Sequence, residues 1–268
     1  MREEDPAIAA EAFPILIKAS EILLEGSPRD QGKAVMTGSL YIMYASAFID
    51  GPASFLPDER YLEKKDAADR AAALYRRAFR LLSEAMERRY PGVIEAAVDG
   101  RADYSRFNKA DVPLLYWTAV SVLAGFGLDP LDFKAARHLG AASAFLARAA
   151  ELDPGWNKGA IWELYVTYYA SMPSYLGGDP AKALDAYDRA VSYSNGGAPS
   201  IFVTYATAIC VPTDDYDGYK SSLERALAID PEADPDARLA TALAQGRARR
   251  LLEGASKYFI LPEGENQP

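Results

Sequence analysis

Apolar residues recur at three- and four-residue intervals through most of this chain, a spacing that gathers them on one face of a helix. The pattern is clearest over residues 156–194, where it predicts two helices joined by a turn. Gly177-Gly178 indicates the end of the first helix, because glycine adopts the left-handed backbone of a C-cap without steric cost. Asp179 can cap the second helix, and Pro180 fits its first turn. Such a hairpin cannot bury its apolar face alone and needs neighbours.

The same periodicity predicts helices before and after this hairpin. They cover residues 5–25, 33–50, 58–90, 112–128, 131–152, 201–210, 216–229 and 237–252. Residues 93–111 are mixed and indicate a short helix and a surface loop. No stretch has the period-two alternation of a strand. The sequence therefore predicts one all-α domain over residues 1–262, with an N-terminal helix, a C-terminal capping helix and a flexible tail over 263–268.

The second helices of the predicted pairs resemble one another. The segment LARAAELDP contains Ala149 and parallels LERALAIDP, which contains Ala226. YDRAV, around Ala190, matches both, and YRRAF, around Ala78, is a fainter copy. Tetratricopeptide repeats are about 34 residues long and place a small residue, an aromatic, an alanine and a proline at these positions. The spacing is irregular, so the sequence predicts an array of degenerate tetratricopeptide-like helical hairpins.

Charge and apolar content restrict the classes of partner. The net charge of −9 argues against a nucleic-acid partner, because affinity for phosphate backbones comes mainly from Lys and Arg. The arginines at 76, 77 and 80 are then expected to form a solvated helix face. The most apolar run, residues 112–128, is shorter than the ~20 residues that span a bilayer and is expected to be a buried helix.

Motifs for catalysis or metal binding are absent from the sequence. His138 is the only histidine and Cys210 the only cysteine, so neither an HExxH nor a paired-cysteine metal site can form. A structural or surface role is favoured for His138. Thr213–Glu224 approaches a calcium loop, but threonine replaces the required first aspartate, and a helix cap is the simpler interpretation. We expect no enzyme activity, no cofactor and no metal.

Large aromatic residues concentrate on the first helices of the predicted pairs, the layer that lines the concave surface of a helical-repeat array. They are Tyr41, Tyr44, Phe48, Trp117, Trp162, Tyr165, Tyr169 and Tyr205. Burial of one such ring contributes roughly 1.5–3 kcal/mol, so many large aromatics simply form core. Tyrosine also keeps a polar tip beside an apolar body, which suits a groove or pore that contacts an amphipathic ligand. Glu163, beside Trp162, is the candidate polar group in that wall.

Five sequence blocks give a specific resemblance. GSLYIMYASAF, LYWTAVSVLAGF, YYASMPSYLGGDPAKAL, VTYA and ALAIDPEADPDARL lie in this order between Gly38 and Leu239. Together they resemble the T component of tripartite ATP-independent periplasmic (TRAP) transporters. The resemblance implies an exported, lipid-anchored helical protein with tetratricopeptide-like repeats that associates with the transporter's periplasmic solute-receptor subunit and is not an enzyme. The lipidated cysteine of the family is missing here, so the membrane anchor would belong to a longer precursor.

We therefore expect a non-enzymatic periplasmic subunit of a TRAP-type uptake system. Its aromatic groove or pore would hold or pass a small, partly hydrophobic or carboxylate solute, and a rim patch would dock the receptor. The alternative is a generic repeat scaffold that grips a peptide or helix of a protein partner. The oligomeric state, including a homo-oligomer, stays open.

Overall fold

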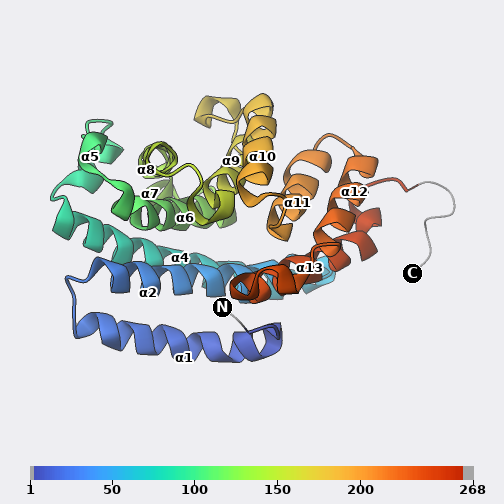
Figure 1. Cartoon of the computed structure of the whole chain (residues 1–268), viewed down its shortest axis with the longest axis horizontal. Helices are drawn as coiled ribbons and strands as arrows, with labels where there is room; N and C mark the ends of the chain where they lie inside the picture. The colour runs from blue at the N-terminus through green and yellow to red at the C-terminus, as the bar shows by residue number, and fades with distance from the viewer. Residues whose placement is uncertain (1–2, 262–268) are drawn as a thin grey trace. The chain divides into compact units, whose positions relative to one another are not determined.

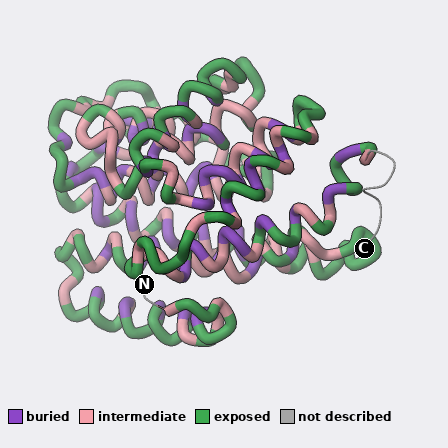
Figure 2. Tube along the Cα trace, turned by 45° about the vertical axis from the view of Figure 1, so that its right-hand side comes forward, coloured by how far each residue is buried: buried purple, intermediate pink, exposed green. Residues whose placement is uncertain are grey.

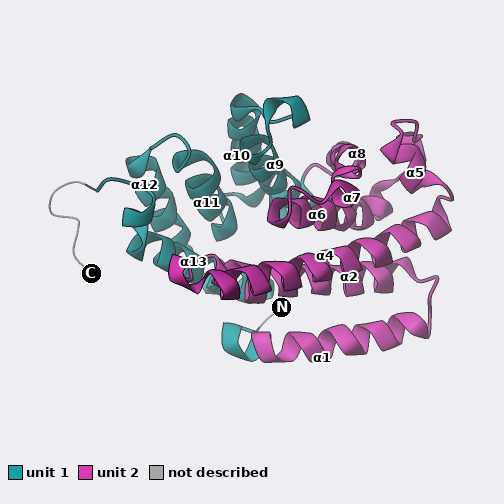
Figure 3. Cartoon of the chain, turned by 180° about the vertical axis from the view of Figure 1, so that it is seen from behind, with its two compact units in different colours: residues 1–9, 155–268 teal, residues 10–154 magenta. Residues whose placement is uncertain are grey.

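The computed structural model describes residues 3–261, and every regular element in that range is helical (Figure 1). The prediction of an all-α fold is confirmed. The chain divides into two compact units (Figure 3): unit 1 contains residues 1–9 and 155–268, and unit 2 contains residues 10–154. The expected single domain over residues 1–262 stays a prediction, and the expected tail over 263–268 lies outside the described residues.

Unit 2 is built from long helices in successive pairwise contact. They are α1 (Pro6–Glu25, whose first turn belongs to unit 1), α2 (Gln31–Ala45), α4 (Tyr61–Arg89), α6 (Val112–Leu128) and α8 (Leu139–Leu152). Three short helices connect them: α3 (Gly51–Ala53), α5 (Val93–Val98) and α7 (Phe133–Ala136). α2 packs on α4, α4 on α6 and α6 on α8 (Figure 1).

The apolar helix α6 lies in the core of unit 2. Residues Lys109–Leu128 have the length and the mean hydropathy, 1.4, of a helix that could cross a membrane, yet half of the stretch is buried inside the protein. Leu114, Leu115 and Ala119 are fully buried where α6 packs against α4 and α8. The expected buried helix is confirmed.

The predicted single helix over residues 131–152 is wrong, because the structure divides it into α7 and α8. The Asp132 carboxylate accepts hydrogen bonds from the backbone N–H groups of Lys134 (2.9 Å) and Ala135 (3.1 Å), so a separate helix starts at Phe133. That helix has four residues and ends before His138, which occupies the N-cap position of α8.

Unit 1 consists of α9 (Ala160–Ser171), α10 (Pro180–Ser194), α11 (Pro199–Tyr205), α12 (Tyr216–Leu227) and α13 (Arg238–Glu253). α9 ends at Ser171, earlier than the predicted Gly177. The ring of Pro173 disfavours helical backbone at Met172, which is extended with ψ 143°, and Gly177 takes its positive φ of 98° in a later turn. The predicted cap of α10 is confirmed, since Asp179 accepts from the N–H groups of Ala181 and Lys182 at 3.0 and 3.2 Å.

A side chain of the last helix, α13, caps the C-terminal end of α12. The buried amide of Gln245 donates to the carbonyls of Ala226, Leu227 and Ile229 at 2.7–3.2 Å. The first two belong to the last turn of α12, where carbonyls lack a partner within the helix, and Ile229 follows that turn. Nearer the other end of α12, the buried Tyr219 hydroxyl donates to the carbonyl of Leu251 at 2.8 Å. These bonds fix α13 against α12 and support the predicted role of a C-terminal capping helix.

Buried positions recur along one side of most helices (Figure 2). The alanines that define the sequence repeat, Ala78, Ala149, Ala190 and Ala226, are all 0% exposed. A residue that small lets a neighbouring helix approach closely. The repeat read from the sequence therefore marks equivalent packing positions in α4, α8, α10 and α12.

Helices α2 and α4 approach each other closely at Gly38. An added Cβ at Gly38 would lie 2.7 Å from Cγ of Leu82, which is fully buried. Overpacking of this kind costs about 1–3 kcal/mol, so Gly38→Ala should lower the free energy of unfolding by that amount in urea titrations.

Gly246→Ala is the matched control. Gly246 lies within α13, and nothing is within 4 Å of its added Cβ. The better helix propensity of alanine should stabilise the protein by about 0.5–1 kcal/mol. Stabilisation by both substitutions would contradict a tight contact between α2 and α4.

Candidate functional site

Unit 2 contains a cavity of about 260 Å³ beside α4, α6 and the break between α7 and α8. α4 contributes Arg76 and Phe79, and α6 contributes Val122 and Gly125. Gly125 has no side chain, which leaves room at this point of the wall. The cavity thus has an apolar inner lining of the kind that small-molecule sites use.

Charged groups surround the same cavity. Arg76 and Lys134 line it and are exposed, which places both cations at its mouth. Neither has an ion-pair partner within residues 3–261. Asp132 also lines the cavity, but its carboxylate is engaged by the backbone N–H groups that start α7.

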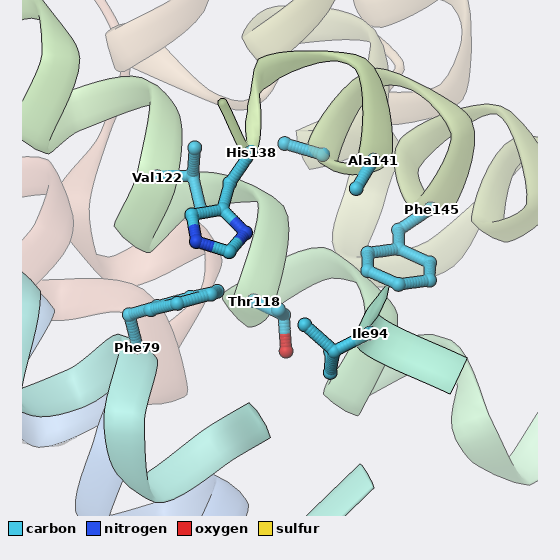
Figure 4. Close-up of a pocket in the computed structure, with 8 residues that line it drawn as sticks. Phe79, Ile94, Thr118, Val122, His138, Ala141 and Phe145 are labelled. Atoms are coloured by element: carbon cyan, nitrogen blue, oxygen red, sulfur yellow. The ribbon is translucent and has the colours of Figure 1, made fainter. Parts of the chain in front are cut away.

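His138 forms the wall between this cavity and the core. Its ring lies 4.8 Å from the ring of Phe79, centroid to centroid. The same two side chains border a smaller space with no room for water, lined on its far side by Ile94, Ala141 and Phe145 (Figure 4). Burial, and secondarily the charge of Arg137, lowers the pKa of His138. The buried Nδ1 atom has no hydrogen-bond partner among the described residues.

The structure brings three of the predicted site residues of unit 1 together on α9. Trp162 lies 5.7 Å from Tyr165, and Tyr165 stacks on Tyr169 at 5.1 Å, centroid to centroid. Cations from α10 cover the outer rings: Arg189 lies 4.6 Å from the centre of Trp162, and Lys182 lies 5.8 Å from the centre of Tyr169. Tyr165 is buried, whereas Trp162 and Tyr169 are partly exposed.

The remaining predicted aromatics are separate from this cluster along the chain. Tyr205 packs on Tyr187 in unit 1, with ring centroids 4.2 Å apart. In unit 2, Tyr44 and Phe48 pack with each other and with Phe13, whereas the buried Tyr41 donates its hydroxyl hydrogen to Glu21.

Trp117 packs edge-on against the neighbouring Tyr116, with ring centroids 5.1 Å apart. None of the eight predicted aromatics lines the cavity of unit 2.

Glu163 faces α11 rather than a groove of aromatic rings. Its carboxylate accepts hydrogen bonds from the hydroxyls of Ser200 (2.9 Å) and Thr204 (3.0 Å). Burial raises the pKa of Glu163, although both hydroxyls and the charge of Arg247 oppose the rise. Glu163 thus makes polar contacts within unit 1, and its burial shifts the carboxyl group toward the protonated form.

The near-calcium loop is a helix cap. Asp215 accepts a hydrogen bond from the backbone N–H of Gly218 at 2.9 Å and starts α12, as the simpler interpretation predicted. Residues 3–261 contain no group of three or more potential metal ligands.

Comparisons with known proteins identify the family. A family model described as "TRAP transporter T-component" matches residues 2–259. The chain belongs to the T-component family of TRAP transporters. It is also 35% identical over 263 residues to an uncharacterized protein of Treponema pallidum (strain Nichols), a match that covers 96% of this chain and 81% of that protein. The resemblance of the five sequence blocks is confirmed, and T components are accessory subunits associated with a TRAP transporter.

The sequence does not predict the cavity of this T component. It favours a solvated helix face for Arg76 and a structural or surface role for His138, and neither expectation places the residue at a cavity. A local signal was present in Asp129-Pro130 and Asp132, which interrupt the helical pattern shortly before the sole histidine. That signal marks a break between helices but does not show which side chains face it.

The raised pKa of Glu163 gives a pH prediction. The unfolded pKa is about 4.3, and the folded pKa is higher, so stability is lost as the pH rises through the folded value. Glu163→Gln keeps an oxygen acceptor and removes the titration. The stability of this variant relative to wild type should therefore increase between about pH 4 and pH 8, measured by urea unfolding.

Glu253→Gln is the control, because Glu253 is an exposed carboxylate on α13. It removes one carboxylate from the surface and leaves the contacts of Glu163 in place. A pH-independent difference for Glu163→Gln would contradict the raised pKa.

Proposed function

We propose that this T component is a non-enzymatic subunit that acts on the periplasmic side of a TRAP uptake system. It docks the solute-receptor subunit and holds or passes a small, partly hydrophobic solute along its aromatic residues. Family membership supports the association with a TRAP transporter. The docking, the solute path and a lipid anchor on a longer precursor are part of the proposal.

The observation that carries the solute-contacting part is the aromatic cluster of α9. Trp162 and Tyr169 are partly exposed, and each ring has a cation above it. An amphipathic, negatively charged solute could place its apolar part on these rings and its charged group beside Arg189 or Lys182.

Exposure divides the predicted site residues into two groups. Tyr41 and Tyr165 are only 2% and 6% exposed, so their rings serve mainly as core. The others, Tyr44, Phe48, Trp117, Trp162, Tyr169 and Tyr205, are partly exposed, as is Glu163. Solute contact is therefore proposed for the partly exposed rings, with the buried tyrosines supporting them from behind.

Substitution of the exposed rings tests this division. Trp162→Ala and Tyr169→Ala should weaken binding to the purified receptor subunit of the same transporter, or to its solute, at least about tenfold, measured by isothermal titration calorimetry. Both variants should stay folded in thermal melts. Tyr165→Ala, the buried neighbour, should instead lose about 3–5 kcal/mol of stability.

Two results would overturn the assignment. If Trp162→Ala and Tyr169→Ala are folded and bind like wild type, the cluster contacts neither receptor nor solute. If they lose as much stability as Tyr165→Ala, all three rings are core.

A further inference from the structure

The cavity of unit 2 has no role in the proposed function. Its lining includes none of the eight predicted aromatics and no residue of the α9 cluster. Two features of its wall are otherwise unexplained: exposed cations at the mouth and an apolar interior.

We propose that this cavity is a binding site for a small organic monoanion with a single ring or a compact branched body. The apolar body lies against Phe79, Val122 and the open position at Gly125. The acidic group lies between Arg76 and Lys134, and the His138 ring closes the inner end of the site.

The volume sets the size of the ligand. A dry apolar cavity of about 150 Å³ binds benzene, and sites for drug-sized molecules measure about 300–1,000 Å³. At about 260 Å³ this cavity lies between them. It has space for one ring, or an equivalent aliphatic body, with one short substituent.

The charges at the mouth set the sign and number of the ligand charges. Arg76 and Lys134 provide two cations, and Asp132 provides one anion already bound to backbone N–H groups. Arg137, next to His138, is paired with Glu95 at 2.8 Å and adds little net charge. The remaining excess of one positive charge matches a monoanion, in a protein whose net charge is −9.

His138 closes the inner end of the cavity. Its ring lies 4.8 Å from the ring of Phe79, centroid to centroid, and these two side chains line both the cavity and the smaller space behind it. Solvent does not reach Nδ1, which has no hydrogen-bond partner among the described residues. The imidazole therefore offers the ligand a flat wall and not a hydrogen bond from Nδ1.

Three probes with a common ring test the charge requirement on the full chain: phenylacetate, the neutral 2-phenylethanol and the cationic phenethylamine. His138 is the sole histidine, so its ring resonances in NMR spectra report on the cavity without ambiguity. Phenylacetate should shift them saturably. 2-Phenylethanol should bind at least about tenfold more weakly, and phenethylamine more weakly still.

Two kinds of variant test the location. Arg76→Gln combined with Lys134→Gln should weaken phenylacetate binding at least about tenfold, since both side chains are exposed and the fold does not need them. Arg80→Gln, an exposed arginine on the same helix that does not line the cavity, is the control and should bind like wild type. Gly125→Leu should fill the cavity and abolish binding while both cations remain.

The proposal is overturned if no probe binds saturably, if 2-phenylethanol binds as well as phenylacetate, or if the double variant binds like wild type. Thermal melts establish that each variant is folded. The docking function is tested separately by receptor binding to Trp162→Ala, so either idea can fail without the other.

Discussion

This structure depends on the close approach of neighbouring helices. Where two helices meet at alanine or glycine, little side-chain volume separates them, and larger residues on either side fill the space that remains. Gly38 against Leu82 is the tightest example, and the fully buried Ala78, Ala149, Ala190 and Ala226 mark the same kind of contact elsewhere. Because interiors are packed as densely as organic crystals, such contacts leave few openings. Any cavity in this fold therefore needs a local departure from regular pairing.

The cavity of unit 2 lies at such a departure. Between α6 and α8 the chain forms α7, a helix of four residues, where the apolar pattern predicted the first part of one helix over residues 131–152. A short helix carries fewer side chains than a full one and covers less of the neighbouring surface. Arg76 and Phe79 of α4 face the uncovered part. The irregularity that made the sequence prediction fail is thus also what creates space for a ligand.

The sequence predicts features that depend on residues close together in the chain better than features that depend on packing between distant elements. Asp179 and its cap were predictable because the bond spans only two or three residues. The repeat alanines were predictable because equivalent helices impose the same spacing. The predicted end of α9 is wrong because Pro173, rather than the conspicuous Gly177, ends the helix. The eight predicted aromatics lie on helices. The sequence does not separate the buried Tyr41 from the partly exposed Tyr44, because neighbouring elements decide which ring is covered.

The cavity forms where residues from α4, α6 and α7 meet, and no local sequence pattern encodes that meeting.

Glu163 and His138 show how polar groups in a largely apolar setting can be given different roles. Glu163 accepts hydrogen bonds from Ser200 and Thr204, so the protein satisfies the group itself and its presence is explained by packing. Burial also desolvates His138, whose Nδ1 has no partner among the described residues and whose ring borders a cavity with two cations at the mouth. Leaving a buried polar atom unpaired costs about 1–3 kcal/mol, and because solvent does not reach Nδ1, a ligand in the cavity would not remove that cost. The protein therefore satisfies the carboxylate in unit 1, whereas the imidazole in unit 2 keeps an unpaired nitrogen and serves the cavity as a flat wall.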